Sequence, residues 1–255
     1  MLFSFILLVS VLASTLATDY DVLLMQHLNN KVANYSQFIL PILNKTNKVN
    51  VSLDIMVSHL VSVDTAKQNI KIAAYVQVSW EEERLVWNPA DFGGVSSTSW
   101  DPAKIWYPII MTYNGNGDEQ ILIPRIRLTL MSKSSSVTTV TSSWRREFEF
   151  FCQFNMSDFP YDQHTCELLF FLATDANPDA VRPVRSAMPM RVTGIYKPSN
   201  EWILKNASSR FGNQKIFYNR RTQRDRTFDL CSAIALEASV NVLFHQSFTD
   251  TLFYS

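Results

Sequence analysis

The segment that most constrains this chain runs from Cys152 to Cys166, with the sequence CQFNMSDFPYDQHTC. Thirteen residues lie between the two cysteines, and Pro160 stands between Phe159 and Tyr161 near their centre. A proline in such a setting favours a rigid turn and raises the share of the cis peptide form. A disulfide between the cysteines would stabilise the fold by about 3 kcal/mol, chiefly by restricting the unfolded chain. The alternative is that the two cysteines are unrelated buried thiols. That alternative does not explain why they enclose the aromatic-proline-aromatic motif.

The first 17 residues form an apolar run that ends in small residues before Thr18 and Asp19, which is the layout of a secretory signal peptide. We expect cleavage near Ala17. No later run reaches the roughly 18 apolar residues of a membrane helix, so the mature chain is expected to be soluble. If Cys152 pairs with Cys166, Cys231 is left either as a free thiol or as the site of an intermolecular disulfide.

Five Asn-x-Ser/Thr sequons also favour a secreted or otherwise extracellular chain, because such chains pass through an oxidising compartment that attaches glycans. They are Asn34, Asn44, Asn50, Asn155 and Asn206. We therefore expect a glycoprotein.

Charge and histidine content argue against other classes. The 23 basic and 23 acidic residues give zero net charge, so nothing global points to nucleic acid or to an anionic membrane surface. The four histidines show no metal-type spacing, and no serine or cysteine stands in a recognisable nucleophile motif. We expect neither an enzyme nor a bound metal or cofactor.

Apolar spacing predicts a helix followed by strands. Within residues 21–38, apolar side chains recur every three or four residues, which indicates an amphipathic helix that Pro41 would stop: Leu24, Leu28, Val32 and Tyr35. From residue 49 the period becomes two, which indicates half-buried strands. The inward phases are Val49, Val51, Leu53, Ile55 and Val57, and then Ile70, Ile72, Ala74, Val76, Val78 and Trp80.

Turn-forming clusters at residues 88–94, 114–118 and 176–179 divide further short runs. Many short strands between such turns favour a sandwich or barrel over a βαβ fold. A chain of this length is commonly one all-β domain.

The segment between the two cysteines resembles the signature loop of the Cys-loop receptors, which are pentameric ligand-gated ion channels, and of their soluble acetylcholine-binding relatives. Further motifs follow in that family's order. WEEERLVWNPADFGG at residues 80–94 is similar to the W-x-D-x-R-L-x-W-N-P-x-D-Y-G-G run of nicotinic-type subunits. IWYPIIMTYN at 105–114 resembles I-W-x-P-D-x-x-x-Y-N, with Ile109 where aspartate is usual, and residues 200–202 resemble the N-G-E-W entry to the late strands.

This resemblance implies a ten-stranded, immunoglobulin-like, all-β sandwich with a short N-terminal α-helix and a disulfide between Cys152 and Cys166. Residues 18–244 would form the ligand-binding domain, and 245–255 a divergent tail without membrane helices. Five copies would ring a central axis and bind ligands between neighbours, inside a box of aromatic rings. Each ring that faces a cationic amine contributes roughly 0.5 to 2 kcal/mol.

The resemblance also assigns site residues. Tyr113 matches an aromatic residue of the principal face, and Trp80 matches a tryptophan of the neighbour's complementary face. Ala173 stands where the family's main cation-binding tryptophan is usual, so that wall is missing. Further candidate ligand contacts are Thr174, Thr141, Ser143, Phe217, Tyr218, Arg221 and Phe228.

Several of these assignments have plainer alternatives. Trp80 shares its phase with the inward residues of its strand and could belong to the core. The other tryptophans Trp87, Trp100, Trp106 and Trp202 are expected in the core or in turns. Residues 219–226, NRRTQRDR, would form a basic lid that selects an anionic group, or simply a solvated hairpin tip. The adjacent cysteine pair of acetylcholine-type principal subunits is absent between Trp202 and Cys231.

The expected function is capture of a small amine or amphiphile between subunits of a homo- or hetero-pentamer. The chain would be a soluble binding protein, a truncated or spliced receptor, or the outer part of a longer channel subunit at the cell surface. Without a tryptophan at position 173, we expect weak acetylcholine binding. The alternative is a structural or decoy subunit that has no ligand of its own.

Overall fold

The computed structural model describes residues 19–116, 121–122, 127–133, 136–157, 164, 166–173, 180–184, 191–197, 202–204, 235–236 and 244–246. Within these residues, one α-helix precedes a long series of strands, which confirms the expected all-β class. The elements are α2 (Tyr20–Val32), β1 (Val49–Asp64), β2 (Asn69–Glu82), η1 (Pro89–Phe92), β3 (Ser97–Trp100), η2 (Pro102–Lys104), β4 (Ile109–Thr112), β5 (Ile121–Leu122), β6 (Leu128–Ser132), β7 (Thr138–Phe151), β8 (Phe170–Ala173), β9 (Val181–Pro183), β10 (Arg191–Lys197), β11 (Trp202–Leu204), β12 (Ala235–Leu236) and β13 (Phe244–Gln246).

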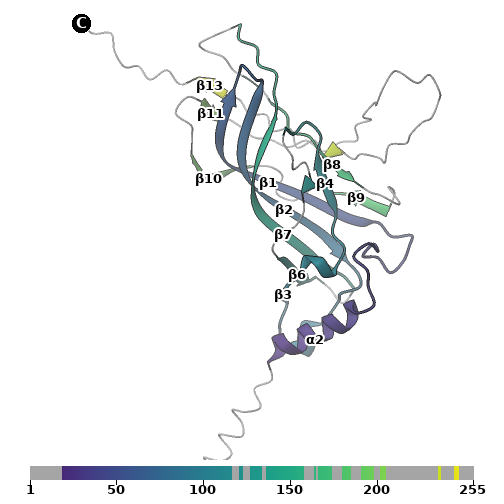
Figure 1. Ribbon diagram of the computed structural model, residues 1–255. Coiled ribbons are helices and arrows are strands. Elements are labelled where there is room, and N and C mark those ends of the chain that lie inside the picture. The colour runs from purple at the N-terminus through teal and green to yellow at the C-terminus, as the bar shows by residue number, and fades with distance from the viewer. Residues whose placement is uncertain are drawn as a thin grey trace, which may run out of the picture.

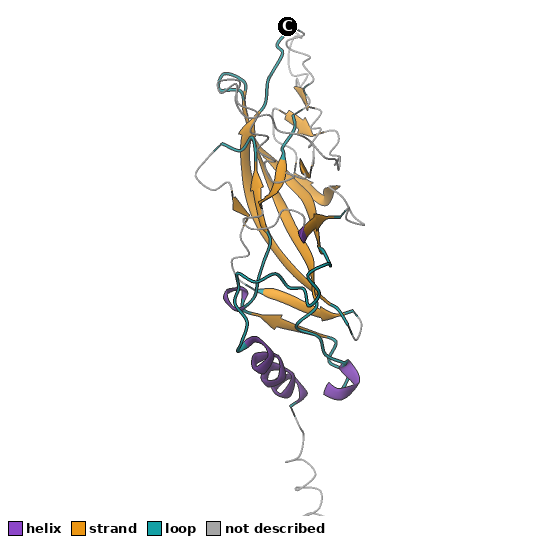
Figure 2. Cartoon of the chain, turned by 90° about the vertical axis from the view of Figure 1, so that its right-hand side faces the viewer, coloured by secondary structure: helices purple, strands orange, loops and turns teal. Residues whose placement is uncertain are grey.

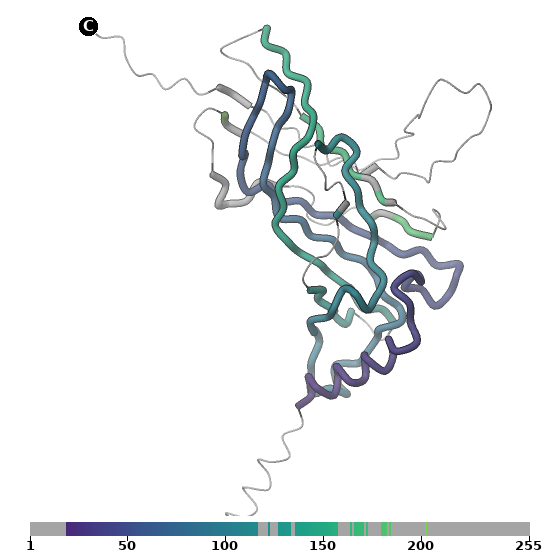
Figure 3. The backbone as a smooth tube through the Cα atoms, viewed as in Figure 1, coloured from purple at the N-terminus to yellow at the C-terminus, as the bar shows by residue number. Residues whose placement is uncertain are grey.

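The strands form two main sheets. The larger, here called the long sheet, has the order β10-β1-β2-β7-β6-β3, with β9 also paired to β1. The smaller has the order β12-β8-β4-β5, and β11 pairs with β13 separately. Figures 1 and 2 show the long strands running through the molecule, with α2 at one end. Figure 3 shows the tubes of β4 and β8 side by side, as their antiparallel pairing requires.

The predicted alternation of the long strands is confirmed residue by residue. Every inward position named from the sequence, from Val49 to Val57 and from Ile70 to Trp80, is at most 8% exposed. Strands β1 and β2 pair antiparallel, with Val51 opposite Trp80 and Leu53 opposite Val78. Because successive side chains point to opposite faces, this register brings the apolar sets of both strands onto one face.

That face packs against the smaller sheet. Phe148 of β7 meets Phe170 of β8 edge to face, with ring centroids 5.5 Å apart. Ile110 and Leu172, which are paired on β4 and β8, are also buried. Two layers thus enclose one core.

The tryptophans occupy this interior, as expected. Trp87, Trp100 and Trp202 are between 3% and 7% exposed, and Trp106 is partly buried against the core. The Trp87 indole nitrogen donates to the Val95 carbonyl at 2.7 Å, which satisfies its polar end.

Helix α2 is shorter than the sequence predicted. Its buried stripe is Leu24, Leu28 and Val32, as expected, but it ends at Val32 and not near residue 38. The Tyr35 backbone nitrogen donates to the Val32 carbonyl at 2.8 Å, which closes a turn there. Tyr35 still packs on the core, where its ring lies 4.8 Å from the Arg84 guanidinium carbon. The apolar spacing at position 35 therefore reflected burial and not helix.

The turn after β2 supports this helix. The Asn88 side chain accepts a hydrogen bond from the Ala90 nitrogen, which caps η1, and Gly93 follows with φ of 61°. A Cβ at Gly93 would lie 2.4 Å from the Tyr20 ring at the start of α2. Glycine is required here both by the left-handed backbone and by this close approach. Within the described part of the chain, no helix is long and apolar enough to cross a membrane.

Candidate functional site

The two cysteines of the signature segment are joined. Cys152 and Cys166 form a disulfide with their Cα atoms 5.2 Å apart, which confirms the expected pairing. Both are at most 3% exposed. Cys152 directly follows β7, and Cys166 lies four residues before β8, so the bond ties the end of the long sheet to the start of a strand in the smaller sheet.

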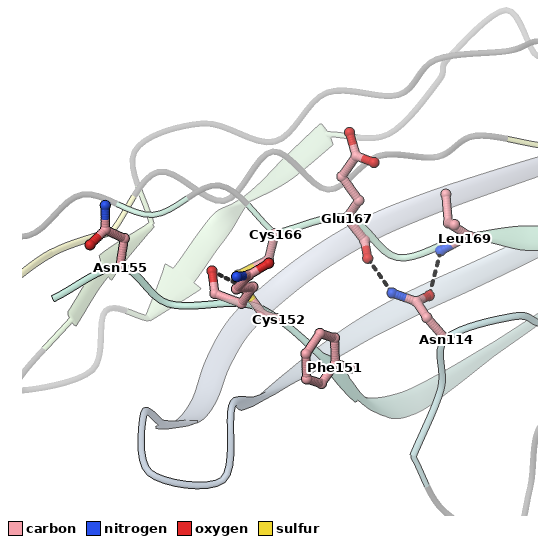
Figure 4. A pocket seen from close by; sticks show the side chains of 8 residues that line it. Asn114, Phe151, Cys152, Asn155, Cys166, Glu167 and Leu169 are labelled. Atoms are coloured by element: carbon pink, nitrogen blue, oxygen red, sulfur yellow. Dashed lines mark hydrogen bonds between the residues drawn. A yellow bond between two sulfur atoms is a disulfide. The ribbon is translucent and has the colours of Figure 1, made fainter.

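Asn114 makes a second link at this corner. Its amide nitrogen donates to the Glu167 carbonyl at 2.5 Å, and its amide oxygen accepts from the Leu169 nitrogen at 2.9 Å (Figure 4). Its own carbonyl accepts from the Phe151 nitrogen at 3.1 Å. One residue thus bonds to the chain on both sides of the disulfide. We call Asn114, Phe151, Cys152, Cys166 and Glu167, with Leu169, the disulfide corner.

An open depression of about 440 Å³ lies at the disulfide corner. It is lined by that corner's residues together with Gln153 and Asn155. Among the described residues that line it, Phe151 carries the one aromatic ring, whereas a box for a cation needs several. It therefore does not match the aromatic ligand box that the resemblance implied.

Tyr113 is the described candidate with the clearest access to a ligand. It follows β4, its backbone nitrogen donates to the Leu169 carbonyl at 2.8 Å, and its side chain is 53% exposed. Ala173 lies opposite Ile109 at the far end of the β4–β8 pair. Tyr113 stands four positions after Ile109, or about 13 Å along the strand at roughly 3.3 Å per residue. Tyr113 and position 173 therefore occupy opposite ends of one strand pair.

Trp80 lies in the core, which is the alternative that the alternation of its strand indicated. It is 1% exposed, and its ring meets Trp106 edge to face at 6.3 Å. Among the described residues no group accepts a hydrogen bond from its indole nitrogen. A ligand would reach this ring only if its neighbours moved. Its role as a complementary-face contact stays a prediction.

Thr141 and Ser143 lie on the other face of the long sheet. Thr141 is paired with Ser79, and their hydroxyl oxygens are 3.2 Å apart. The Ser143 hydroxyl donates to the Gln77 side chain at 3.4 Å. Since side chains alternate along a strand, these two point away from Trp80. The structure does not bring the three candidates together in one chain.

The remaining candidates fall outside the described residues. These are Thr174, Phe217, Tyr218, Arg221 and Phe228, together with the sequon Asn206, the thiol of Cys231, the signal segment and the basic 219–226 loop. Their assignments stay predictions.

The structure also shows a buried ion pair that sequence reasoning missed. Glu82 is 0% exposed and Arg84 6%, and the Arg84 Nε and Nη2 atoms donate to the two carboxylate oxygens at 2.8 and 2.9 Å. A bidentate geometry of this kind is the strongest form of such a pair. Arg84 lies in the bend that follows β2, so the alternation of strand side chains carried no signal for this pair.

In the described ranges, no three His, Cys, Asp or Glu side chains are grouped so as to hold a metal ion. Burial, helped by the Lys31 charge, lowers the pKa of His27 from its ordinary value of 6.5. His27 packs on the Phe92 ring at 5.3 Å, far along the chain from the disulfide corner.

A two-layer strand fold with a helix at one end and a disulfide-closed loop at a sheet corner is the architecture that the resemblance implied. Comparison with known proteins agrees. The profile of the neurotransmitter-gated ion-channel ligand binding domain matches residues 23–223. This chain belongs to that family, which is the one of the Cys-loop receptors, a family of receptor domains and not of enzymes.

Individual relatives are receptor subunits. The chain is 26% identical over 201 residues to the neuronal acetylcholine receptor subunit alpha-2 of Pan troglodytes, covering 78% of this chain and 36% of the relative. It is 29% identical over 141 residues to an acetylcholine receptor subunit alpha-like of Manduca sexta, covering 54% and 26%. With the subunit beta-3 of Rattus norvegicus, 26% identity extends over 60% of this chain and 31% of the relative. The chain thus spans about a third of the length of these relatives.

Proposed function

We propose that this chain is an extracellular subunit that binds a small amine or amphiphile at its interface with neighbouring subunits of a pentamer. The exposed ring of Tyr113 carries the proposal. It stands at the end of β4, 53% exposed in the lone chain, at the position that matches an aromatic residue of the family's principal face. An exposed aromatic ring held by a rigid strand end suits cation binding.

Exposed apolar side chains support assembly of this chain with other subunits. The relatives are subunits of acetylcholine receptors. In this chain, three large apolar side chains between α2 and β1 are mostly exposed: Phe38 at 84%, Leu43 at 71% and Ile39 at 56%. Apolar side chains gathered on one loop are typical of surfaces that another chain covers.

Acetylcholine is expected to bind weakly to a homopentamer. Position 173 holds alanine where the family has its main cation-binding tryptophan, and Trp80 is buried at 1% exposure. Two of the aromatic walls are then missing from the ligand box, and each wall contributes roughly 0.5 to 2 kcal/mol. Ligands of other chemistry, or a pentamer in which another subunit supplies the principal face, suit this chain better.

Isothermal calorimetry on the secreted chain tests these statements. Screening amines and amphiphiles by thermal shift first identifies a ligand, because binding to the folded form raises its melting temperature. Tyr113→Ala should then weaken that ligand by about 2- to 30-fold, which corresponds to 0.5 to 2 kcal/mol. Tyr75→Ala is the matched control, since Tyr75 is a comparably exposed tyrosine at 40% on β2. Equal effects of the two substitutions would contradict the proposal.

Restoring a wall is the complementary experiment. Ala173→Trp should strengthen acetylcholine binding by a similar factor if position 173 faces the ligand. Micromolar or tighter binding of acetylcholine by the unmodified homopentamer would overturn the expectation of a weak site.

A decoy subunit is the second candidate function, and the burial of Trp80 favours it. Such a chain would join hetero-pentamers without a ligand of its own. Light scattering separates the two, because a monomer that shows no thermal shift with any ligand supports the decoy.

The proposed compartment is the extracellular space, reached by a signal peptide that covers residues 1–17 and is removed near Ala17. N-terminal sequencing of secreted material checks this. A chain that retains its first 17 residues would contradict the proposal.

A further inference from the structure

Four of the five sequons lie within the described residues, and their asparagines differ in what they touch. Asn34, Asn44 and Asn155 are exposed and stand in loops or turns. Asn50 is half-buried within β1. This difference decides where the folded chain has room for a glycan.

Asn155 has the most open arrangement. Its side-chain oxygen accepts from the Ser157 backbone nitrogen at 3.1 Å and from the Ser157 hydroxyl at 2.5 Å. No described residue accepts from its amide nitrogen. Figure 4 shows the Asn155 side chain at the edge of the depression, apart from the disulfide. The amide nitrogen that would carry a sugar therefore has no hydrogen-bond partner among the described residues.

Asn44 forms a separate turn of the same kind. Its side-chain oxygen accepts from the Thr46 nitrogen at 3.1 Å, and the residue is exposed. At Asn34 the sequon hydroxyl is used differently, because Ser36 accepts from the Phe38 nitrogen at 3.2 Å. Asn44 is thus the second sequon with the arrangement found at Asn155.

At Asn50 both ends of the side-chain amide are occupied by neighbouring strands. The amide nitrogen donates to Glu81 at 2.7 Å. The amide oxygen accepts from Arg182 Nε at 3.1 Å and from Nη2 at 2.9 Å. A sugar on this nitrogen would lie between β2 and β9 and would displace one of these charged groups.

We infer that the folded chain carries N-glycans on Asn155 and Asn44 and none on Asn50. The inference rests on the proposed extracellular function, because the oligosaccharide donor is a polyprenyl pyrophosphate of the secretory pathway. In the transfer, the bond from sugar C1 to the pyrophosphate oxygen breaks and a bond from C1 to asparagine Nδ2 forms. The nitrogen releases one proton, and the lipid pyrophosphate leaves.

A glycan on Asn155 would have a structural consequence. It is a bulky, strongly hydrated group, and Asn155 lies three residues after Cys152 on the rim of the disulfide corner's depression. The outer side of that corner would then stay in water. A tight interface with another domain over this rim is incompatible with the glycan.

Glycopeptide mapping of the full chain secreted from eukaryotic cells tests the inference. Enzymatic deglycosylation in heavy-oxygen water labels each occupied asparagine. We expect Asn155 and Asn44 to be mostly occupied, and Asn50 to be occupied at least about tenfold less, since its folded contacts include three charge-assisted hydrogen bonds. Occupancy of Asn50 equal to that of Asn155, or an unoccupied Asn155 beside an occupied Asn44, would overturn the inference. If every sequon of the secreted chain is unoccupied, the glycan inference fails and the extracellular proposal stands, whereas a chain that is not secreted contradicts the extracellular proposal.

Matched variants at the sequon hydroxyls complete the test. Ser157→Ala should remove one glycan from the intact mass, whereas Ser157→Thr should retain it. Ser52→Ala, which destroys the Asn50 sequon, should leave the glycan mass unchanged. A loss of one glycan in Ser52→Ala would contradict the inference even if the other variants failed to fold.

Discussion

The long sheet and the disulfide corner are stabilised in different ways. Strands β2 and β7 stay in one uninterrupted register from Asn69 opposite Phe151 to Glu82 opposite Thr138. At the corner, regular pairing stops, and Gly115 and Phe150 form an isolated bridge. There a disulfide and one asparagine side chain replace the ladder. The sheet thus depends on a repeated pattern, and the corner on a few contacts of specific residues.

We expect the largest loss of stability from a substitution at a buried position of the long sheet. Phe150 and Phe151 are adjacent in β7, but Phe150 is 0% and Phe151 49% exposed. Phe150→Ala should lower the free energy of unfolding by about 3 to 5 kcal/mol, because it opens a cavity in the core. Phe151→Ala should cost less than about 1 kcal/mol. Urea denaturation measures both, and similar losses would refute the two-faced arrangement.

Removal of the disulfide is the next largest perturbation. Cys152→Ala with Cys166→Ala should lower the free energy of unfolding by about 3 kcal/mol through the greater freedom of the unfolded chain. Cys231→Ala serves as the control, since it leaves this bond intact. Chemical denaturation compares the three proteins. A double variant as stable as the parent would show that the corner needs no covalent link.

Asn114 should matter less than the disulfide but more than its neighbour. Asn114→Ala removes two hydrogen bonds to the backbone of residues 167 and 169 and should cost about 1 to 3 kcal/mol, because it leaves partly buried groups unsatisfied. Asn116 is exposed, and among the described residues its side chain bonds only the Asn69 side chain. Asn116→Ala should therefore change the unfolding free energy by less than about 0.5 kcal/mol. Equal effects would deny Asn114 its linking role.

The smallest effect concerns the helix end of the molecule, away from the corner. Burial lowers the pKa of His27 below 6.5, so the folded chain favours the neutral ring. As pH falls through 6.5, the unfolded chain binds a proton first, and stability decreases until the folded imidazole also protonates. The denaturant concentration at the unfolding midpoint should therefore decrease as the pH is lowered from about 7 to about 5. His27→Gln should lose that part of the pH dependence, and an unaltered slope would exclude His27 as its source.

Much of the long sheet could be predicted from the sequence, because strand burial leaves a period-two record. The inward phases from Val49 to Val57 and from Ile70 to Trp80 are confirmed. The helix was predicted too long, since Tyr35 is buried by a turn that follows α2. Local spacing alone does not distinguish these two reasons for burial.

The candidate site was less predictable. The resemblance made Trp80, Thr141 and Ser143 candidate ligand contacts. The register of β2 with β7 directs Trp80 to the core and the two hydroxyls to the opposite face. Asn114 stood in a predicted turn with no role assigned to it. Its importance depends on residues 167 and 169, more than fifty positions away.

The order of residues determined the strand alternation, the motif between the two cysteines and the family to which the chain belongs. Folding in three dimensions decided that Trp80 faces inward and that Asn114 links two sheets. It also decided that Asn50 is held between Glu81 and Arg182, whereas no described residue bonds the amide nitrogen of Asn155. The reason is physical. Periodicity is a property of residues that are close together along one strand. Exposure and hydrogen bonding depend on which distant segments pack against that strand.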